Sequence, residues 1–297
     1  MSRVTLIVPR NPSKPLETSE IVGQVSGWGC VSLGTLLLQH GHEVEILDES
    51  SGPLDPDAVE ADIVGLSIMT ATAKRGYELA DSFRREGRRV ILGGAHASAL
   101  PEEAAAHADC VVVGEGENAI ARAVESRSPA RIVQGTPVGR LDDLPLPDAG
   151  LALGRLDGQT FAPVFTSRGC PWGCDFCSES AMFGRRYRER GLDGVLAELA
   201  LYEGRAVGFY DANLGVDRQR LKDLLRRMLA EDAVPPAWAA EATLDLAADG
   251  ELLGLMRQTN CRALLVGIET LNPQVAPGYR KLLPRETRFQ VVWVGWG

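Results

Sequence analysis

The chain has 297 residues and a formal net charge of −9, with 45% hydrophobic and 24% charged residues. These fractions are typical of a folded globular protein, and the length suits two domains. The acidic balance argues against a general nucleic-acid binder. The N-terminal apolar run, Val4 to Val8, is too short for a signal peptide, and no window reaches the roughly 18 apolar residues of a membrane span. We therefore expect a cytoplasmic protein whose thiols stay reduced.

The first 135 residues alternate short apolar runs with helical patterns. Strands are expected at Val4–Val8, His42–Leu47, Ile63–Met69, Arg89–Leu92 and Cys110–Val113. Helices are expected at Trp28–Gln39, at Lys74–Arg85, from Pro101 onward and at Asn118–Glu125. This alternation predicts an α/β domain with a doubly wound parallel sheet, whose ligands bind beyond the carboxyl ends of the strands.

Small and polar residues follow three of these strands at that expected ligand edge. They are Ser67 and Thr70 after the third strand, Gly93, Gly94 and His96 after the fourth, and Gly114, Glu115 and Gly116 after the fifth. Glycine lets a large ligand approach the backbone closely. Each loop alone also fits ordinary turn chemistry, but three such loops on one edge favour a ligand site.

Residues 136–160 carry three prolines and little periodicity, which predicts a linker. A second domain is expected from Phe161 to the end of the chain. Its strands are expected at Ala162–Thr166, Ala206–Tyr210, Trp238–Leu244 and Leu264–Ile268, and its helices at Val195–Tyr202, after Asp217 and after Asp249. Repeated strand–helix units predict a full or partial (β/α) barrel with its active site at the strand carboxyl ends.

Three cysteines, Cys170, Cys174 and Cys177, form a CxxxCxxC motif within SRGCPWGCDFC, residues 167–177. Thiolates favour zinc or iron–sulfur clusters, but a structural zinc site needs a fourth ligand and none is local. A disulfide would leave one thiol over. Three thiolates on a 4Fe-4S cluster leave one iron open to a small molecule, which is a catalytic arrangement. Zinc or an ordinary surface loop remains the alternative.

The stretch RGCPWGCDFC resembles the cluster loop of radical S-adenosylmethionine (SAM) enzymes, and Phe176, before the last cysteine, matches that pattern too. The resemblance implies that the three cysteines hold a 4Fe-4S cluster whose open iron chelates SAM. It also implies that the reduced cluster cleaves SAM to a 5'-deoxyadenosyl radical. Polar residues at the barrel strand ends hold SAM in this family, which nominates Asp211, Asn213, Glu241 and Glu269. Each of these could instead be a solvated or salt-bridged side chain.

The N-terminal loops resemble the cobalamin-binding domain fused ahead of a subgroup of radical SAM enzymes that includes the hopanoid methylases. Ser67, Gly93 and Gly94 match positions that line the nucleotide-tail channel, and His96 is a possible tail contact. The cobalt-ligating histidine of the DxHxxG motif is absent, because Ser50 stands at the place that we compare with it. The resemblance implies a flavodoxin-like cobalamin-binding domain at 1–135, a linker at 136–160 and a radical SAM partial barrel at 161–297.

The resemblance implies a cobalamin-dependent radical SAM methyltransferase acting on a small molecule, such as a lipid or natural-product intermediate. An external electron donor such as a flavodoxin or ferredoxin is expected. A radical cyclisation or rearrangement, and a non-catalytic remnant, are the alternatives. The match fades after Pro273, where one further candidate strand, Gln290–Val294, remains. We therefore expect an incomplete barrel that is poorly soluble and slow or inactive on its substrate.

Overall fold

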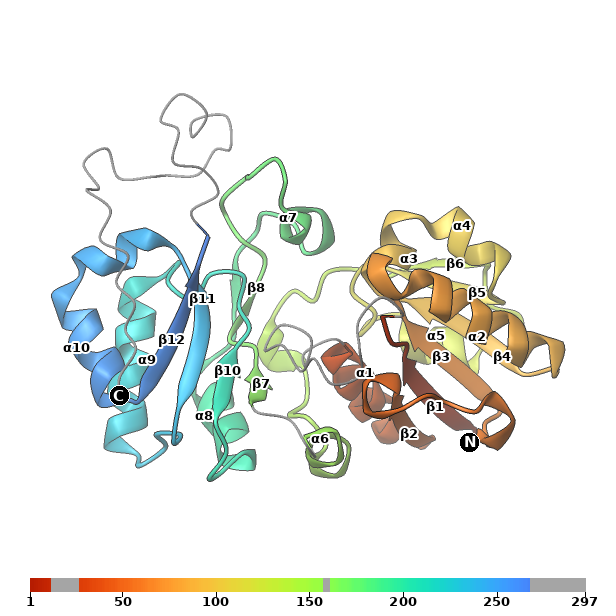
Figure 1. Ribbon diagram of the computed structural model, residues 1–297, viewed down its shortest axis with the longest axis horizontal. Coiled ribbons are helices and arrows are strands. Elements are labelled where there is room, and N and C mark those ends of the chain that lie inside the picture. Colours follow the sequence, from red (N-terminus) through yellow and green to blue (C-terminus); the bar gives the residue numbers. More distant parts are fainter. Residues whose placement is uncertain (12–26, 157–160, 268–297) are drawn as a thin grey trace. The chain divides into compact units, whose positions relative to one another are not determined.

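The computed structural model describes residues 1–11, 27–156 and 161–267. The chain divides into two compact units (Figure 1). The N-terminal unit comprises residues 1–139 and 145–158, and the C-terminal unit comprises residues 140–144 and 159–297. Each described unit is built from parallel strands joined by helices, so the expected α/β class is confirmed.

The N-terminal unit contains a six-stranded parallel sheet in the order β2-β1-β3-β4-β5-β6. The strands are β1 (Arg3–Val8), β2 (Glu43–Asp48), β3 (Ile63–Ser67), β4 (Arg89–Gly93), β5 (Cys110–Val113) and β6 (Ile132–Gln134). The order 2-1-3-4-5 is that of flavodoxin-like folds, in which the winding direction reverses between β1 and β3 and leaves a crevice for a ligand there. The sequence did not predict β6, a three-residue edge strand too short to show a period.

Helices cover both faces of this sheet (Figure 1). One face carries α1 (Trp28–Gln39) and α5 (Ile120–Glu125), with Leu37 and Ile120 among its buried residues. The other carries α2 (Ala73–Arg85), α3 (Ala95–Ala99) and α4 (Pro101–Ala106), with Phe83 fully buried. Because both faces are covered, the inner strands β1, β3, β4 and β5 read as nearly continuous apolar runs rather than as alternating ones.

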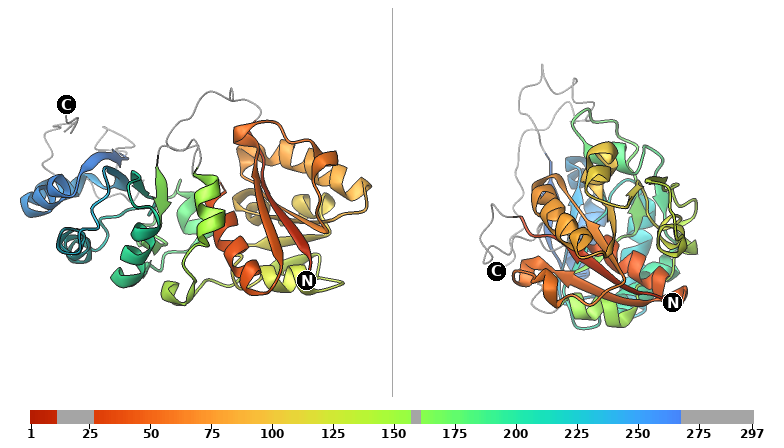
Figure 2. Two further views of the ribbon diagram at one scale, coloured as in Figure 1. Left: turned by 90° about the horizontal axis from the view of Figure 1, so that it is seen from below. Right: turned by 90° about the vertical axis from the view of Figure 1, so that its right-hand side faces the viewer.

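Part of the expected linker is helical and packs on the N-terminal unit. After the short 3-10 turn Leu141–Asp143, helix α6 spans Ala149–Arg155 and lies beside α1 (Figure 2). Asp148 caps α6 by accepting the N–H of Leu151 at 3.0 Å, and its own N–H donates to Thr35 Oγ1 at 2.8 Å. A Cβ at Gly34 would lie 2.9 Å from Leu151 Cδ1, so a small residue on α1 allows this close packing.

The C-terminal unit contains a four-stranded parallel sheet in the order β12-β11-β10-β7. The strands are β7 (Ala162–Val164), β10 (Val207–Phe209), β11 (Trp238–Ala242) and β12 (Cys261–Val266), joined by α8 (Leu192–Leu201), α9 (Arg218–Ala230) and α10 (Gly250–Gln258). Strands that follow one another in chain order, with helical crossovers, wind as a (β/α) barrel does. The described part of this sheet is open, as expected for a partial barrel. Glu269 and the candidate strand Gln290–Val294 lie outside the described residues.

The cysteine motif lies in the long connection between β7 and α8, at the carboxyl end of the sheet (Figure 1). This connection begins with β8 (Ser167–Arg168), includes α7 (Ser178–Met182) and ends with β9 (Arg188–Glu189). Strands β8 and β9 pair antiparallel. No helix in the described part of the chain is long and apolar enough to cross a membrane.

Candidate functional site

The cysteine loop is shaped by two tight backbone contacts. Gly169 has a φ of +78°, and a Cβ there would lie 2.5 Å from the carbonyl oxygen of Arg186, so only glycine fits this close approach. The N–H of Cys177 donates to the carbonyl of Cys174 at 3.1 Å and closes a turn ahead of α7. These contacts fold the three-cysteine segment into a compact loop.

The three thiols lie close enough to influence one another. Cys170 is 8% exposed, whereas Cys174 and Cys177 are partly exposed. Burial raises the pKa of the Cys170 thiol, and the charges of Cys177 and Cys174 raise it further, while a backbone hydrogen bond from Trp172 opposes them. Three neighbouring thiolates are therefore costly unless a cation neutralises them, and a bound metal deprotonates and pairs with thiols outright.

The donor set fits an iron–sulfur cluster. Within the described residues, no three His, Cys, Asp or Glu side chains converge on one point as ligands of a single metal ion would. In a cubane cluster each thiolate binds a different iron, so its ligands are spread more widely. The other cysteine of the C-terminal unit, Cys261, begins β12 and lies at the amino end of the sheet. Phe176, within the loop, is 51% exposed.

Two of the nominated strand-end residues are fully engaged within the protein. Asp211 is 1% exposed and accepts hydrogen bonds from the N–H groups of Thr166 at 2.7 Å and Ser167 at 3.1 Å, and from the Thr166 hydroxyl. Asn213 is 4% exposed; its amide donates to Thr243 Oγ1 at 3.2 Å and accepts the N–H of Gly215 at 3.0 Å. Both side chains therefore organise the strand-end loops.

Glu241 is placed differently, because it is exposed on β11 next to this edge. Neighbouring atoms remove part of its hydration and raise the pKa of its carboxyl. Glu179 on α7 shares this environment: burial raises its pKa first, the backbone N–H of Gly169 opposes that shift, and the charges of Asp211 and Glu241 add to it. Three carboxyl groups thus crowd the carboxyl end of the sheet beside the cysteine loop. The sequence motifs did not identify Glu179, which lies in the first turn of α7.

The carboxyl edge of the N-terminal sheet brings the nominated loops after β3 and β4 together. Ile68 N–H donates to the carbonyl of Gly93 at 2.9 Å, and His96 N–H donates to the carbonyl of Ile68 at 3.1 Å. Gly94 has a φ of +93° and ψ of −177°, and a Cβ there would lie 2.7 Å from the Ile68 carbonyl oxygen. This backbone conformation is essentially restricted to glycine. Ser67 and Gly93 are both partly exposed on this edge.

His96 joins this edge to the helices that follow it. It is 7% exposed; Nδ1 lies 3.1 Å from Thr70 Oγ1, and Nε2 lies 3.3 Å from a carboxylate oxygen of Glu103. Tyr77 donates to the same carboxylate at 3.0 Å. Both ring nitrogens are therefore occupied, which favours an internal role for His96. Thr70 itself is exposed.

The third nominated loop follows β5 and is tied to the chain after β6. Gly114 has a φ of +79°, and its N–H donates to Ser98 Oγ at 2.9 Å. Glu115 is 4% exposed and accepts the N–H of Val138 at 3.0 Å. Gly116 packs under Leu33 of α1, whose side chain would lie 3.2 Å from a Cβ there. Buried Glu115 thus anchors the chain that leaves the sheet, while both glycines allow close packing.

The position of Ser50 does not favour its comparison with a cobalt-ligating histidine. Residues 48–52 follow β2, the edge strand, whereas the ligand crevice of this sheet order opens between β1 and β3. The segment after β1 begins at Pro9; its residues 12–26 lie outside the described part, and their sequence contains no histidine. Glu49, next to Ser50, is instead a buried brace that pairs with Arg75 and accepts the N–H groups of Arg10 and Leu54, each at 3.2 Å.

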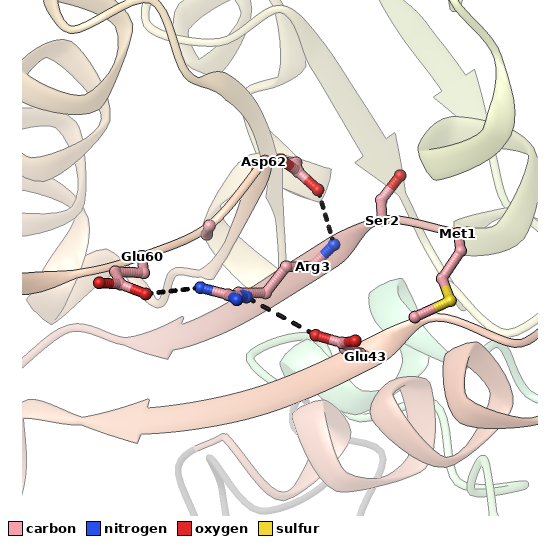
Figure 3. Close-up of a pocket in the computed structure, with 7 residues that line it drawn as sticks. Met1, Ser2, Arg3, Glu43, Glu60 and Asp62 are labelled. Carbon is pink, nitrogen blue, oxygen red and sulfur yellow. Dashed lines mark hydrogen bonds and ion pairs between the residues drawn. The ribbon is translucent and has the colours of Figure 1, made fainter.

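A pocket of about 480 Å³ lies at the opposite, amino end of this sheet (Figure 3). Arg3 donates its N–H to Asp62 at 2.8 Å and its guanidinium to Glu60 at 2.7 Å, and lies 3.6 Å from Glu43. The acidic side chains that line this pocket are thus all paired with Arg3, through its guanidinium or its backbone N–H. Because ligands of doubly wound sheets bind at the carboxyl edge, we assign the site to that edge and not to this pocket.

Comparisons with known proteins agree with both halves of the chain. A model of the B12 binding domain matches residues 18–124. The bacteriochlorophyllide d C-8(2)-methyltransferase of Chlorobaculum tepidum is 29% identical over 272 residues, which cover 84% of this chain and 60% of that protein. The hopanoid C-2 methylase of Rhodopseudomonas palustris is 29% identical over 204 residues, covering 65% and 38%. An anaerobic magnesium-protoporphyrin IX monomethyl ester cyclase of Synechocystis is 25% identical over 313 residues, covering 91% and 62%.

The chain thus spans less than two thirds of the length of these relatives. Among solved structures, the radical SAM methyltransferase TsrM from Kitasatospora setae, with cobalamin and a [4Fe-4S] cluster bound, is similar to this chain. The alignment covers 94% of this chain and 63% of the TsrM chain. Its TM-score is 0.70 at 19% identity, a likeness that shows the fold. The B12 binding domain, the cysteine loop ahead of a partial barrel and these relatives lead to one conclusion: the chain belongs to the family of radical SAM enzymes that carry a cobalamin-binding domain.

Proposed function

We propose that this protein is a cobalamin-dependent radical SAM methyltransferase that transfers a methyl group to an unactivated carbon of a small molecule. The observation that carries the proposal is the cysteine loop at the carboxyl end of the C-terminal sheet. The loop brings three thiols together, and no fourth cysteine joins them within the described residues. Such a loop leaves one iron of a cubane cluster free to bind a substrate-like ligand.

The residues divide between the cofactors as follows. Cys170, Cys174 and Cys177 would hold the cluster, and Phe176 and Glu241, which are exposed, would contact SAM. In the N-terminal unit, Ser67, Thr70 and the glycines at 93, 94, 114 and 116 would line the cobalamin edge. When bound, SAM and the cluster supply a 5'-deoxyadenosyl radical, and cobalamin supplies a methyl carrier. The protein binds these groups, orients them and keeps water from them.

Partners and compartment belong to the same proposal. A 4Fe-4S cluster needs an external electron donor, such as a flavodoxin or ferredoxin, and a cytoplasmic location keeps the thiols reduced. The substrate would be a small molecule such as a lipid or natural-product intermediate. Support for this class comes from relatives whose names specify pigment and hopanoid methylation.

A second candidate is a radical cyclase of the same architecture. It is favoured by the relatives named as magnesium-protoporphyrin ester cyclases, one of which aligns over 91% of this chain. Nothing in the described cysteine loop separates the two reactions, because both begin with the same radical.

Product analysis with methyl-deuterated SAM distinguishes the two. The reconstituted protein is incubated under strict anaerobiosis with a reductant, cobalamin and candidate pigment and hopanoid substrates. A product that carries three deuterium atoms supports methyl transfer. Formation of 5'-deoxyadenosine with an unlabelled, rearranged product would contradict methyl transfer and support the cyclase.

A further inference from the structure

The cysteine segment is attached to its sheet through a very short stem. Only two residue pairs join β8 to β9, namely Ser167 with Glu189 and Arg168 with Arg188. The N–H of Arg190 adds one contact, donating to the carbonyl of Thr166 at 2.9 Å. An isolated two-stranded ladder is marginally stable at best, so a ladder this short does not fix the position of the loop by itself.

A buried carboxylate holds the outgoing end of the stem. Asp211 comes two residues after β10, which is hydrogen-bonded to β7. Its Oδ1 accepts the N–H groups of Thr166 and Ser167, and its Oδ2 accepts the Thr166 hydroxyl. A carboxylate offers about four acceptor positions, and at least three of these are therefore in use. Asp211 thus ties the first residues of the stem to the neighbouring strand, and the SAM contact that we expected of it has little acceptor capacity left.

A guanidinium from α9 joins both ends of the stem. Arg220 Nη2 donates to the carbonyl oxygens of Thr166 at 3.2 Å and Arg190 at 2.6 Å. Its Nη1 donates to Thr166 Oγ1 at 3.1 Å, and Nε lies 3.8 Å from a Glu189 carboxylate oxygen. Planar guanidinium groups suit such multiple contacts because their donors are fixed in a fork. One side chain therefore ties the outgoing and returning ends of the stem together.

The hydroxyl of Thr166 links the two charged groups. It donates to Asp211 and accepts from Arg220, so its single proton and one of its two lone pairs are used. Thr166 is fully buried. The negative and positive groups are thus linked through one hydroxyl, and removal of that hydroxyl would cost each group one hydrogen bond in a largely buried position.

We propose that Thr166, Asp211 and Arg220 form a loop clamp, a set of positioning residues that holds the cysteine stem on the sheet. The inference rests on the proposed cluster and adds to it the groups that hold the three thiolates in position. Cys170 lies only four residues after Thr166 in the sequence, so movement of the stem would displace the first thiolate directly. The clamp residues act through the backbone of the stem and not on the cluster itself.

The test compares how long the cluster is retained. Wild-type protein, Thr166→Val and Arg220→Met are reconstituted anaerobically, and iron loss to a ferrous chelator is followed with time. Residues that orient metal ligands typically change metal affinity by about 10- to 100-fold, and we expect iron loss to be faster by a factor of that order. The electron paramagnetic resonance spectrum of the reduced cluster, with and without SAM, should also become heterogeneous.

Three matched variants separate the clamp from general stability. Thr166→Ser keeps the hydroxyl and should behave as the wild type does. Arg227→Met removes an arginine of the same helix that pairs with Asp193 and Glu231 at the surface, and should also retain iron. Arg220→Lys keeps the charge but cannot reach three acceptors at once, and should lose iron faster than the wild type.

The outcomes distinguish the clamp from the proposed function. Wild-type protein that binds no cluster overturns both. Wild-type protein that holds a cluster, with Thr166→Val and Arg220→Met releasing iron at the wild-type rate, overturns the clamp alone. If Thr166→Val does not fold, the Arg220→Lys variant provides the test. Iron loss from Arg220→Lys at the wild-type rate then overturns the clamp. Rapid loss in Thr166→Val that Thr166→Ser does not share supports it.

Discussion

Arg75 Nη2 lies 2.6 Å from Glu49 Oε1, and the Glu49 side chain is completely buried. Burial alone would raise the pKa of this carboxyl, but hydrogen bonds from Arg75 and from two backbone N–H groups outweigh it, and the net pKa is lowered. A carboxyl whose pKa is lowered on folding stabilises the fold above its unfolded pKa, and this contribution is lost as the pH falls through the lowered value.

We therefore predict that Glu49→Gln destabilises the protein at pH 7 by about 3 kcal/mol, the typical result of removing one partner from a buried ion pair. The difference from the wild type should shrink as the pH falls below about 4, where free glutamate is protonated. Urea unfolding at several pH values measures it. Glu60→Gln, which removes an exposed partner of Arg3, should cost less than about 1 kcal/mol. Equal losses of stability in Glu49→Gln and Glu60→Gln would contradict a stabilising role for the buried pair of Glu49 and Arg75.

The second prediction concerns the backbone at Gly94. Gly94→Ala would place a Cβ 2.7 Å from the Ile68 carbonyl oxygen in a conformation that alanine avoids. We expect a loss of at least about 3 kcal/mol in stability and loss of cobalamin binding. Gly87→Ala is the control, because Gly87 also has a positive φ, +79°, but has no heavy atom within 4 Å of its Cβ position. It should cost about 1 kcal/mol and leave cobalamin binding intact. Titration with hydroxocobalamin followed by absorbance measures both.

The third prediction concerns the cysteine loop. Anaerobically reconstituted protein should bind about four irons and four sulfides per chain, and replacement of Cys170, Cys174 and Cys177 by Ala together should abolish this binding. Cys261→Ala should leave the iron content unchanged, since Cys261 begins β12 at the other end of the sheet. Iron and sulfide assays measure the content of each protein. Full iron in the triple variant, or one zinc in the wild type, would contradict the assignment.

The fourth prediction concerns the cobalt. The chain has four histidines; three of them, His40, His42 and His107, lie at the amino edge of the N-terminal sheet, and His96 has both ring nitrogens engaged. Bound cob(II)alamin should therefore lack an axial nitrogen from a protein side chain. Its electron paramagnetic resonance spectrum should be the same in the wild type and in His96→Ala. Nitrogen superhyperfine splitting that disappears in His96→Ala would refute the prediction.

The sequence predicts most of the fold, because its strands and helices carry strong local patterns. Helix α1 and strand β5 begin and end where their apolar periods predict. The elements that it missed are short, such as α3, with five residues, and β6, with three. Elements of this length bury too few side chains to leave a period in the sequence, and they form because neighbouring strands and loops supply their partners.

The candidate site was predicted less completely. Cysteine spacing is a local property and identifies the loop directly. The contacts of Asp211 depend on backbone N–H groups of residues 166 and 167, 45 and 44 residues earlier in the chain, which no local pattern records. Arg220 lies on α9, 54 residues after Thr166 in the sequence, and only the fold brings the two side chains together. Sequence motifs therefore cannot identify residues that act through distant backbone groups.

The connector between the units has a consequence for synthesis on the ribosome. Residues 140–144 belong to the C-terminal unit, while residues 145–158, including α6, belong to the N-terminal one. Until residue 158 has left the exit tunnel, the N-terminal unit therefore lacks the helix that covers Gly34 and the N–H of Asp148 that donates to Thr35. Domains generally fold as units while the chain is made, the N-terminal one first. A nascent chain that exposes residues only up to about 139 should thus remain sensitive to protease around α1, and one that exposes residue 158 should become resistant.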